Sequence, residues 1–391
     1  MSADTLTTLP EGGAAPLAPP SGARQVWRRL RARPAAVAGG AVVVLLVLVA
    51  AGAPLLAALE GQDTTTYHAA LLDSRAGAVP LGHFGGISGQ HWLGVEPGTG
   101  RDLFARLVYG ARTSLAIALG ATVLQVVVGV ALGLAAGLGN RFVDALLSRV
   151  TDVFVTMPAL VFTIALLAIV PSGFPRPVLL ALVLGLLAWG GTAKIVRAQV
   201  LAHKSLDYVA ASKLAGSSTW RTARRELLPA LVAPVLTYAA IQLPTNIVSE
   251  AGLSFLGIGV TPPTSSWGQM LSSAATWYQA DSAYVLLPAL LLFVTVLAFT
   301  VFADGVRVAL DPRAAGRLGV GTRKERRAEA RKAAGAGAAD AAGSVSGSAA
   351  VTATADAPGS ANGPAAASGS SAAAAAADSG SGSGEEKGGA R

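Results

Sequence analysis

Three acidic residues lie in or beside long apolar segments, and this makes them the candidates for proton or ion chemistry: Asp152, Glu250 and Asp304. A carboxylate at membrane depth can relay protons or balance a transported cation. We expect Asp152 and Asp304 near the cytoplasmic ends of their segments and Glu250 near the outer end. Such positions favour helix caps and local salt bridges over a proton relay.

The sequence offers little for enzymatic chemistry. It has no Gly-Lys dipeptide and therefore no phosphate-binding loop of the Walker A type. It has no cysteine, and its four histidines lack the spacing of metal ligands: His68, His83, His91 and His203. We therefore predict that the chain is not an enzyme by itself and carries no catalytic residue, cofactor or metal.

The composition is that of a membrane protein. Of the 391 residues, 52% are hydrophobic and 13% are charged, whereas a soluble domain carries about 25% charged residues. The formal net charge of +8 would suit nucleic acid, but Lys and Arg cluster beside apolar runs without interleaved aromatic residues. We therefore predict an integral membrane protein that contacts lipid and does not bind nucleic acid.

Six apolar runs are each long enough to cross a hydrocarbon core of about 30 Å. They cover residues 35–59, 113–138, 146–170, 177–197, 230–250 and 283–304. The fifth run contains Pro234, Gln242, Pro244 and Asn246, which are tolerated at membrane depth where they face protein or a water-filled cavity. A cleaved signal peptide is the alternative for the first run, but that run is longer than signal peptides usually are. The pattern predicts an all-α protein with six transmembrane helices.

The basic residues set the expected orientation. Five arginines precede the first run, and further Lys and Arg occupy the loop 198–229 and follow the sixth run. We therefore expect both termini and this loop in the cytoplasm, and the loops 60–112, 171–176 and 251–282 outside. Three arginines lie on the outer side against this rule: Arg101, Arg106 and Arg112.

Composition also divides the chain into four parts. They are a mostly disordered cytoplasmic segment at 1–34, a first transmembrane helix with an extracytoplasmic loop at 35–112, a core of five transmembrane helices at 113–313, and a low-complexity disordered cytoplasmic tail at 314–391. The tail is mainly Ala, Gly and Ser, which bury too little surface to offset the entropy of ordering. In the core, Gly129, Gly133 and Gly137 share one helix face and predict close packing of a second helix.

The loop 207–229 begins with the pattern of a short helix and a sharp reversal. Asp207 can cap a helix that ends at Leu214, because its carboxylate can accept a hydrogen bond from a free backbone N–H. Gly216 can then end the helix in a left-handed conformation. This half of the loop therefore predicts a helix that projects from the membrane and turns back.

The second half of the loop has the pattern of another helix that joins the fifth apolar run. Ser217 or Ser218 can cap this helix. Pro229 suits the first turn of the following span, where its missing N–H costs nothing. The whole loop therefore predicts a compact helical elbow in the cytoplasm, which a partner could contact. The alternative is an ordinary basic loop that only sets the topology.

The elbow resembles the EAA loop of binding-protein-dependent ABC importer permeases, whose pattern is E-A-A-x3-G-x9-I-x-L-P. The positions that match are Ala211, Gly216, Leu228 and Pro229. The positions that depart from the pattern are Ala210 for the Glu, Ser212 for the second Ala and Glu226 for the Ile. In this family the loop is the contact with the ATPase subunits.

Longer segments carry the same resemblance. Residues 250–268, EAGLSFLGIGVTPPTSSWG, are similar to the EAGLSFLGLGxxPPxPSWG pattern of the dipeptide, oligopeptide and nickel group of these permeases. Residues 91–94 and 100–102 are similar to that group's HPLGTDxxGRD element. Further matching segments are 109–115 and 304–313. The likeness covers about residues 25–313 and indicates the C-type permease subunit of the group.

The resemblance implies a fold, a location and a set of partners. It implies the type I ABC importer permease fold with six transmembrane helices, in the cell membrane. The partners it implies are a homologous B-type permease, two cytoplasmic ATPase subunits that bind ATP and Mg, and an extracytoplasmic solute-binding protein. The implied function is to form half of the path of an ATP-driven importer, with peptides as the expected substrate.

The resemblance also assigns residues. It implies coupling to the ATPases through Asp207, Tyr208, Ala210, Ala211, Ser212, Gly216, Leu228 and Pro229. For the translocation path or outer gate, we expect Asn246, Glu250 and Ser254. The domain at 113–313 would then be the permease core, with the EAA-like loop at 207–229.

Other functions stay open at this point. An ion-coupled secondary transporter acting alone is one, although we find no internal repeat and no acidic residue in the middle of a span. An ABC permease for nickel or another small solute is a second. A membrane scaffold is a third, but it would leave the interrupted fifth span unexplained.

Overall fold

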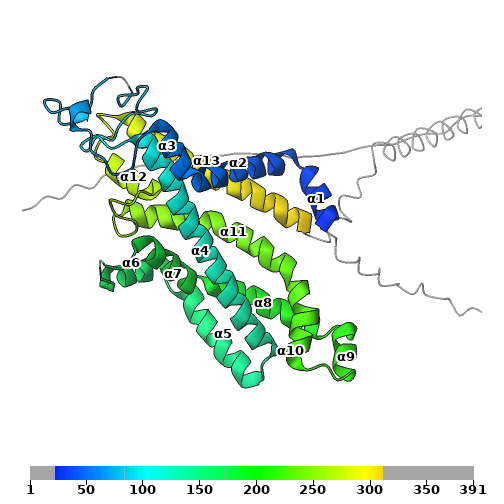
Figure 1. The fold of residues 1–391 in the computed structure, drawn as a ribbon. Helices are drawn as coiled ribbons and strands as arrows, with labels where there is room; N and C mark the ends of the chain where they lie inside the picture. The colour runs from blue at the N-terminus through cyan, green and yellow to red at the C-terminus, as the bar shows by residue number, and fades with distance from the viewer. Residues whose placement is uncertain (1–22, 83, 172, 311–391) are drawn as a thin grey trace, which may run out of the picture. The chain divides into compact units, whose positions relative to one another are not determined.

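The computed structural model describes residues 23–82, 84–171 and 173–310 (Figure 1). These residues are mostly helical, and the predicted tail at 314–391 lies outside them. The helices before the loop 207–229 are α1 (Ala23–Arg31), α2 (Pro34–Ala51), α3 (Ala53–Glu60), α4 (Leu103–Leu138), α5 (Arg141–Thr156), α6 (Ala159–Ile169), α7 (Arg176–Leu187) and α8 (Trp189–Lys204). From the loop onward they are α9 (Asp207–Leu214), α10 (Thr219–Thr222), the π-helical turn η2 (Ala223–Leu227), α11 (Leu228–Phe255), α12 (Trp267–Ala274) and α13 (Ser282–Leu310).

The predicted first span is shorter than expected and is followed by a separate helix. The apolar run at 35–59 divides at Gly52 into α2, which is long and apolar enough to cross a membrane, and α3, which begins beside Pro54. Proline at this point is compatible with the start of a helix but not with its interior. Before these, α1 is a helix that the composition of the segment 1–34 did not predict.

α4 is the central helix and begins earlier than predicted. It has 36 residues, starts at Leu103 instead of residue 113, and is capped by Asp102, whose Oδ1 accepts a hydrogen bond of 2.7 Å from the N–H of Ala105. The predicted outer loop, called the outer loop below, therefore covers residues 61–102 and is shorter than the predicted range 60–112. It contains a short helix, η1 (Ala69–Leu71), and two antiparallel strands, β1 (Leu72–Asp73) and β2 (Val79–Pro80).

The glycine face of α4 packs against α8, as the sequence predicts. A Cβ added to Gly133 would lie 2.7 Å from the Cβ of Val196 and 2.7 Å from the carbonyl oxygen of Ala193. Gly129 and Gly137 are equally close to side chains of α8. Close backbone approach of this kind is how membrane helices pack when no hydrophobic effect draws them together.

The predicted third span, at 146–170, is sharply bent. The run divides into α5 and α6, which meet at an angle of 87° around Met157 and Pro158. Inside a helix, a proline removes one backbone hydrogen bond, and its ring clashes with the carbonyl four residues earlier. Helices therefore usually end at or before the residue that precedes a proline, and α5 ends just before Met157 and Pro158. The described residues thus contain five helices that are long and apolar enough to cross a membrane, or six if the bent pair is one span.

The remaining spans agree with the predicted runs. α7 and α8 form one apolar span of 29 residues. η2 joins α10 to α11, and together they make one helical segment of 37 residues, Thr219–Phe255, with Pro234 and Pro244 inside. α13 has 29 residues and contains Pro288. The fold class is therefore confirmed as an all-α membrane protein.

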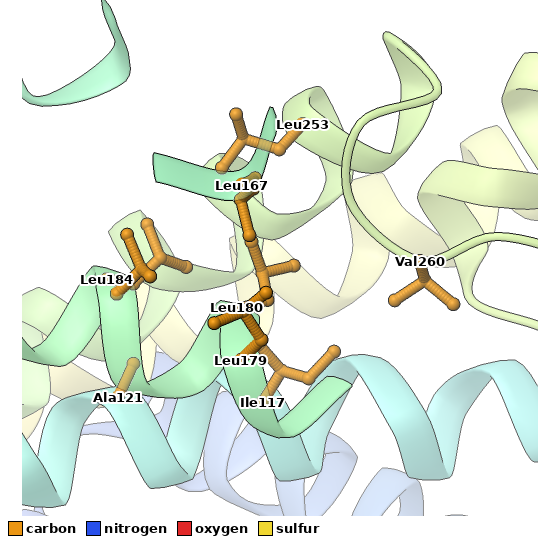
Figure 2. Packing of buried hydrophobic residues seen from close by; sticks show 9 residues of the cluster. Ile117, Ala121, Leu167, Leu179, Leu180, Leu184, Leu253 and Val260 are labelled. Carbon is orange, nitrogen blue, oxygen red and sulfur yellow. The ribbon is translucent and has the colours of Figure 1, made fainter. Parts of the chain in front are cut away.

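A buried cluster holds the short α6 in place (Figure 2). Leu167 of α6 is 1% exposed and lies among Leu180 of α7, Ile117 of α4 and Leu253 of α11. Each close carbon pair contributes only about 0.1–0.2 kcal/mol, but a buried Leu makes tens of such contacts. The loop after α11 joins the same cluster through Val260, so this loop is part of the packed structure.

Candidate functional site

The predicted elbow forms, with one change at its start. Gly216 has a φ of +82°, and the N–H of Ser217 donates a hydrogen bond of 3.1 Å to the carbonyl of Ser212, which is the pairing of a Schellman cap. The left-handed role of Gly216 is therefore confirmed. Asp207 is the first helical residue and not the cap, because the carbonyl of Leu206 already accepts hydrogen bonds from residues 209 and 210.

The second half of the elbow is continuous with the fifth span. Ser218 caps α10, and its Oγ accepts a hydrogen bond of 3.4 Å from the N–H of Arg221. Pro229 lies in the first turn of α11, as predicted, directly after the wider turn of η2. A π turn accommodates a residue without an N–H, so the chain passes from α10 into α11 without a break.

The elbow is anchored on one side and exposed on the other. Val209 is fully buried against α8 and α11, among Val196, Val200, Leu227 and Leu231. On the exposed side of the elbow, Leu214 is 90% exposed and Trp220 is 74% exposed. The predicted contact residues Tyr208, Ala210, Ala211, Gly216, Leu228 and Pro229 are also exposed, and Ser212 is half-buried.

Charge surrounds this apolar surface. Arg221, Arg224 and Arg225 are exposed on the second half of the elbow. Burial, with a smaller contribution from the negative charge of Glu226, raises the pKa of the Tyr208 phenol above its ordinary value. The elbow therefore presents large apolar side chains beside a basic patch, a combination that marks an interaction surface.

Asn246 is buried between helices of the bundle. It is 3% exposed, and its Nδ2 donates hydrogen bonds to Thr122 Oγ1 at 2.8 Å and to Gln125 Oε1 at 3.1 Å. Gln125 Nε2 donates in turn to the carbonyl of Leu184 at 3.2 Å. The predicted polar position in the fifth span thus faces protein and joins α4, α7 and α11.

Glu250 is buried, which differs from the expectation of a cap or salt bridge. It is fully buried, and its Oε1 accepts a hydrogen bond of 2.8 Å from Ser254 Oγ. Ser254 Oγ also accepts from the N–H of Val260 at 3.0 Å. In the described part of the chain no Lys, Arg or His forms an ion pair with Glu250, and its Oε2 has no hydrogen-bond partner. By contrast, Asp152 forms the expected salt bridge, with Lys194 at 2.8 Å.

The rest of the segment 250–268 closes tightly on the same helix. The indole Nε1 of Trp267 donates to the carbonyl of Leu107 at 3.2 Å, and its backbone N–H donates to Ser114 Oγ at 3.3 Å. A Cβ on Gly268 would lie 2.4 Å from the carbonyl oxygen of Ala251, so only glycine fits there. This segment therefore locks the end of α11 onto α4.

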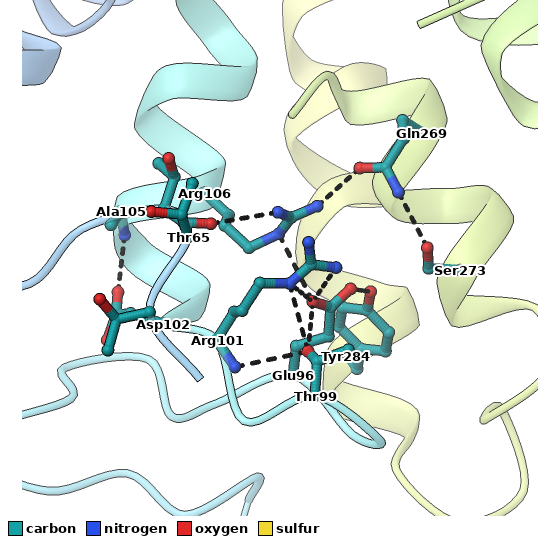
Figure 3. Close-up of polar contacts among 12 residues, drawn as sticks. Thr65, Glu96, Thr99, Arg101, Asp102, Ala105, Arg106, Gln269, Ser273 and Tyr284 are labelled. Atoms are coloured by element: carbon teal, nitrogen blue, oxygen red, sulfur yellow. Dashed lines mark hydrogen bonds and ion pairs between the residues drawn. The ribbon is translucent and has the colours of Figure 1, made fainter. Parts of the chain in front are cut away.

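A buried ion network lies at the same end of the bundle, and sequence reasoning missed it (Figure 3). Glu96 pairs with Arg101 at 2.6 Å, lies 3.6 Å from Arg106 Nε and accepts a short hydrogen bond from the hydroxyl of Tyr284. Arg106 also donates to Gln269 Oε1 at 2.6 Å. Arg101 and Arg106, which lie on the predicted outer side against the charge rule, thus make buried ionic contacts within the fold. The feature of the sequence that could have indicated these contacts is the spacing of both arginines from Glu96.

A second group of titratable side chains adjoins this network. His91 Nδ1 lies 2.8 Å from Asp102 Oδ2, and the N–H of Trp92 donates to Glu60 Oε1 at 2.7 Å. Burial, with the nearby charge of Asp102, raises the pKa of Glu60 to about 7 against the opposing hydrogen bond from Trp92. Among the described residues, no group of three or more His, Cys, Asp or Glu side chains could hold a metal ion.

The predicted residues fall into two separate places. The predicted coupling residues lie on the elbow and at the start of α11. Asn246, Glu250 and Ser254 lie on the other half of that helix, in buried clusters. Their predicted role in a translocation path or outer gate stays a prediction.

Two family profiles match the chain. Residues 129–316 match the family described as "Binding-protein-dependent transport system inner membrane component". Residues 21–72 match "N-terminal TM domain of oligopeptide transport permease C". Together they cover most of the described helices.

Curated proteins show the same likeness. The chain is 35% identical over 228 residues to the glutathione transport system permease protein GsiD of Pectobacterium atrosepticum, covering 58% of this chain and 74% of that protein. It is 30% identical over 290 residues to the dipeptide transport system permease protein DppC of Alkalihalophilus pseudofirmus, covering 74% of this chain and 90% of the relative. Among solved structures, an inward-facing MetNI methionine ABC transporter matches 54% of this chain and 98% of that chain, at 19% identity and a TM-score of 0.43.

Proposed function

Because the chain belongs to the family of binding-protein-dependent transport system inner membrane components, we propose that it is the permease subunit of an ATP-driven importer of small peptides. The relatives whose names mention dipeptides and glutathione support a peptide substrate. Membership of this family argues against two of the other functions considered above, an ion-coupled secondary transporter and a membrane scaffold. Nickel or another small solute is the substrate alternative.

The observation that carries the proposal is the exposed elbow. Leu214 and Trp220 are largely exposed beside a basic surface, although the residues beneath them are packed. An apolar surface on a rigid support is what a docking site requires. The proposed occupants are two ATPase subunits, one on this elbow and one on that of a homologous B-type permease. These subunits would hold ATP and Mg and carry out the hydrolysis.

The remaining partners follow from the same family. We infer that an extracytoplasmic solute-binding protein delivers the peptide to the end of the bundle formed by the loop 61–102 and α12. The orientation inferred from the basic residues places both termini and the elbow in the cytoplasm, with the protein in the cell membrane. The second permease would complete the path.

Co-purification tests the docking. A tagged form of this chain, expressed with the permease and ATPase subunits encoded beside it, should retain the ATPases. Trp220→Ala should reduce the retained ATPase at least fivefold, because it removes the largest exposed side chain of the elbow. The matched control is Trp92→Ala, since Trp92 is also exposed but lies in the outer loop. Equal retention by both variants would exclude the elbow as the docking site.

A further inference from the structure

The short basic helix α1 lies where the chain enters the membrane. Pro34 keeps Arg33 in extended backbone, with φ −111° and ψ 99°, so α1 ends at Arg31 and the chain turns before α2 (Figure 1). The 18 residues of α2 make about 27 Å of helix, and a hydrocarbon core is about 30 Å thick. The first residue of α2 is therefore at or outside the edge of the core, which places α1 at headgroup level.

One face of α1 is attached to the end of α13. A Cβ added to Gly305 would lie 3.2 Å from Cδ1 of Leu30. Arg29 NH1 donates a hydrogen bond of 3.4 Å to the carbonyl of Ala309. Val26, Arg29 and Leu30 are half-buried, and their spacing of three and four residues puts them on one side of the helix. α1 is thus fixed on the bundle, and its opposite face has a defined direction.

The opposite face combines an aromatic ring with cations. Trp27 is 54% exposed, Arg28 and Arg31 are exposed, and Cζ of Arg31 lies 4.6 Å from the centre of the Trp27 ring. In the described part of the chain no acidic side chain forms an ion pair with these arginines or with Arg33. Tryptophan is enriched at the membrane–water interface, where its ring and a neighbouring cation are both accommodated.

The charges around this face have an excess of positive sign. Residues 12–59 contain no Asp or Glu, so α1 and α2 bring no negative charge. The end of α13 brings one acid and one base, Asp304 and Arg307, which offset each other. Just beyond α13, outside the described residues, the sequence adds one acid and two bases: Asp311, Arg313 and Arg317. A positive surface at headgroup level attracts anionic lipids more than zwitterionic ones.

We propose that Trp27, Arg28 and Arg31 form a binding surface for the headgroups of anionic phospholipids. The guanidinium groups donate charge-assisted hydrogen bonds to the phosphate oxygens, and the Trp27 ring lies among the headgroups and the upper acyl chains. Because the other face of α1 is attached to α13, the bound lipid also holds the end of α13 at the membrane surface. The inference rests on α2 crossing the membrane and is independent of the import of peptides.

The test uses the absence of cysteine from the chain. Ala32→Cys introduces a single thiol at an exposed position beside α1, and a benzophenone maleimide on it cross-links to what lies nearby. The full chain, with the subunits that co-purify with it, is placed in vesicles of phosphatidylcholine and phosphatidylglycerol with identical acyl chains. Mass spectrometry then gives the ratio of the two lipids in the adducts. We expect phosphatidylglycerol to be enriched about fivefold over its share of the vesicle.

Two matched variants in the same background locate the effect. Arg28→Gln/Arg31→Gln should return the adducts to the lipid ratio of the vesicle, because the cations of the proposed surface are removed. Arg141→Gln/Arg149→Gln removes the same charge from exposed positions of α5 and should keep the enrichment. Adducts at the ratio of the vesicle in the parent chain, or an enrichment that survives Arg28→Gln/Arg31→Gln, overturn the inference.

The remaining outcomes also decide. Adducts with a co-purified subunit in place of lipid overturn the inference and make this face of α1 a protein contact. If Arg28→Gln/Arg31→Gln does not insert, the parent chain is cross-linked at low and at high salt. Loss of the enrichment at high salt supports the proposal, since attraction between exposed charges is screened. An enrichment that salt does not change overturns it.

Discussion

At the scale of single residues, the conformation of Gly216 is the feature most directly tied to the proposed coupling with the ATPases. Its φ of +82° is strained for other residues, but among the described residues nothing lies within 4 Å of an added Cβ. The cost of a substitution is therefore a backbone cost of roughly 1–2 kcal/mol. Crowding within this chain adds nothing to it.

We expect Gly216→Asp to abolish peptide uptake while membrane insertion stays intact, because the strained turn and the new charge both disturb the elbow. Gly216→Asn should retain more activity, since Asn adopts the left-handed conformation more readily. Uptake in vesicles at equal protein level provides the measurement. Wild-type uptake by Gly216→Asp would remove this residue from the coupling role.

Glu60 gives a second prediction at this scale. Its pKa is raised from 4.5 to about 7, so between these values the folded chain holds a proton that the unfolded chain has released. The contribution of Glu60 to stability should therefore be fully present below about pH 4.5 and should be lost as pH rises from about 4.5 to about 7. The thermal midpoint in detergent across this range is the measurement. Glu60→Gln should flatten the slope, whereas Asp63→Asn should keep it.

The residues that sequence could and could not predict differ in one physical respect. Gly216 and Ser218 act through their own backbone and near neighbours, so their types and spacing predicted the turn and the cap. Glu250 is buried by a segment that folds back over it, and Arg106 is paired with Gln269 of α12. Such environments depend on contacts between distant parts of the chain, which spacing alone does not reveal.

At the scale of elements, hydropathy predicted the apolar lengths but not their directions. The run at 146–170 is continuous in composition, yet α5 and α6 meet at 87°. The run at 35–59 is likewise divided, at Gly52. Pro54 and Pro158 were visible in the sequence, but prolines also lie inside α11 and α13 without ending them. Only packing against neighbours separates these outcomes.

The contact between α4 and α8 allows a direct test. We expect Gly133→Ala to lower stability by about 1–3 kcal/mol, because the methyl group would overlap Val196 and Ala193. Gly252→Ala is the control, since in the described structure nothing lies within 4 Å of that position. Thermal midpoints of the purified variants give the comparison. A smaller effect at Gly133 than at Gly252 would contradict the packing.

At the scale of the whole molecule, the ion network around Glu96 joins three parts that are far apart in sequence. It links the outer loop, the start of α4 and the α12–α13 region through Arg101, Arg106 and Tyr284. All of these side chains are buried, and Glu96 is the acid that both arginines face, so removing Glu96 would leave two buried positive charges without it. The network therefore determines how the outer loop sits on the bundle.

We expect Arg106→Ala to lower stability by about 2–5 kcal/mol, because it empties the volume of a fully buried side chain and leaves Gln269 Oε1 without its donor. Arg112→Ala should cost little, because Arg112 is exposed on the same helix. Thermal midpoints and limited proteolysis of the outer loop would show the difference. Equal midpoints for the two variants would mean that the network does not stabilise the fold.

The continuity of the segment Thr219–Phe255 has a geometric consequence. Its 37 residues make a rod of about 55 Å at 1.5 Å per residue. For such a rod, a tilt of about 5° at the elbow swings the far tip by about 5 Å, roughly one helical turn. Pro234 and Pro244 each remove one backbone hydrogen bond, so the helix can bend at these positions and reduce the displacement of its far tip. A small push on one side of the membrane would thus become a sizeable displacement beside Glu250.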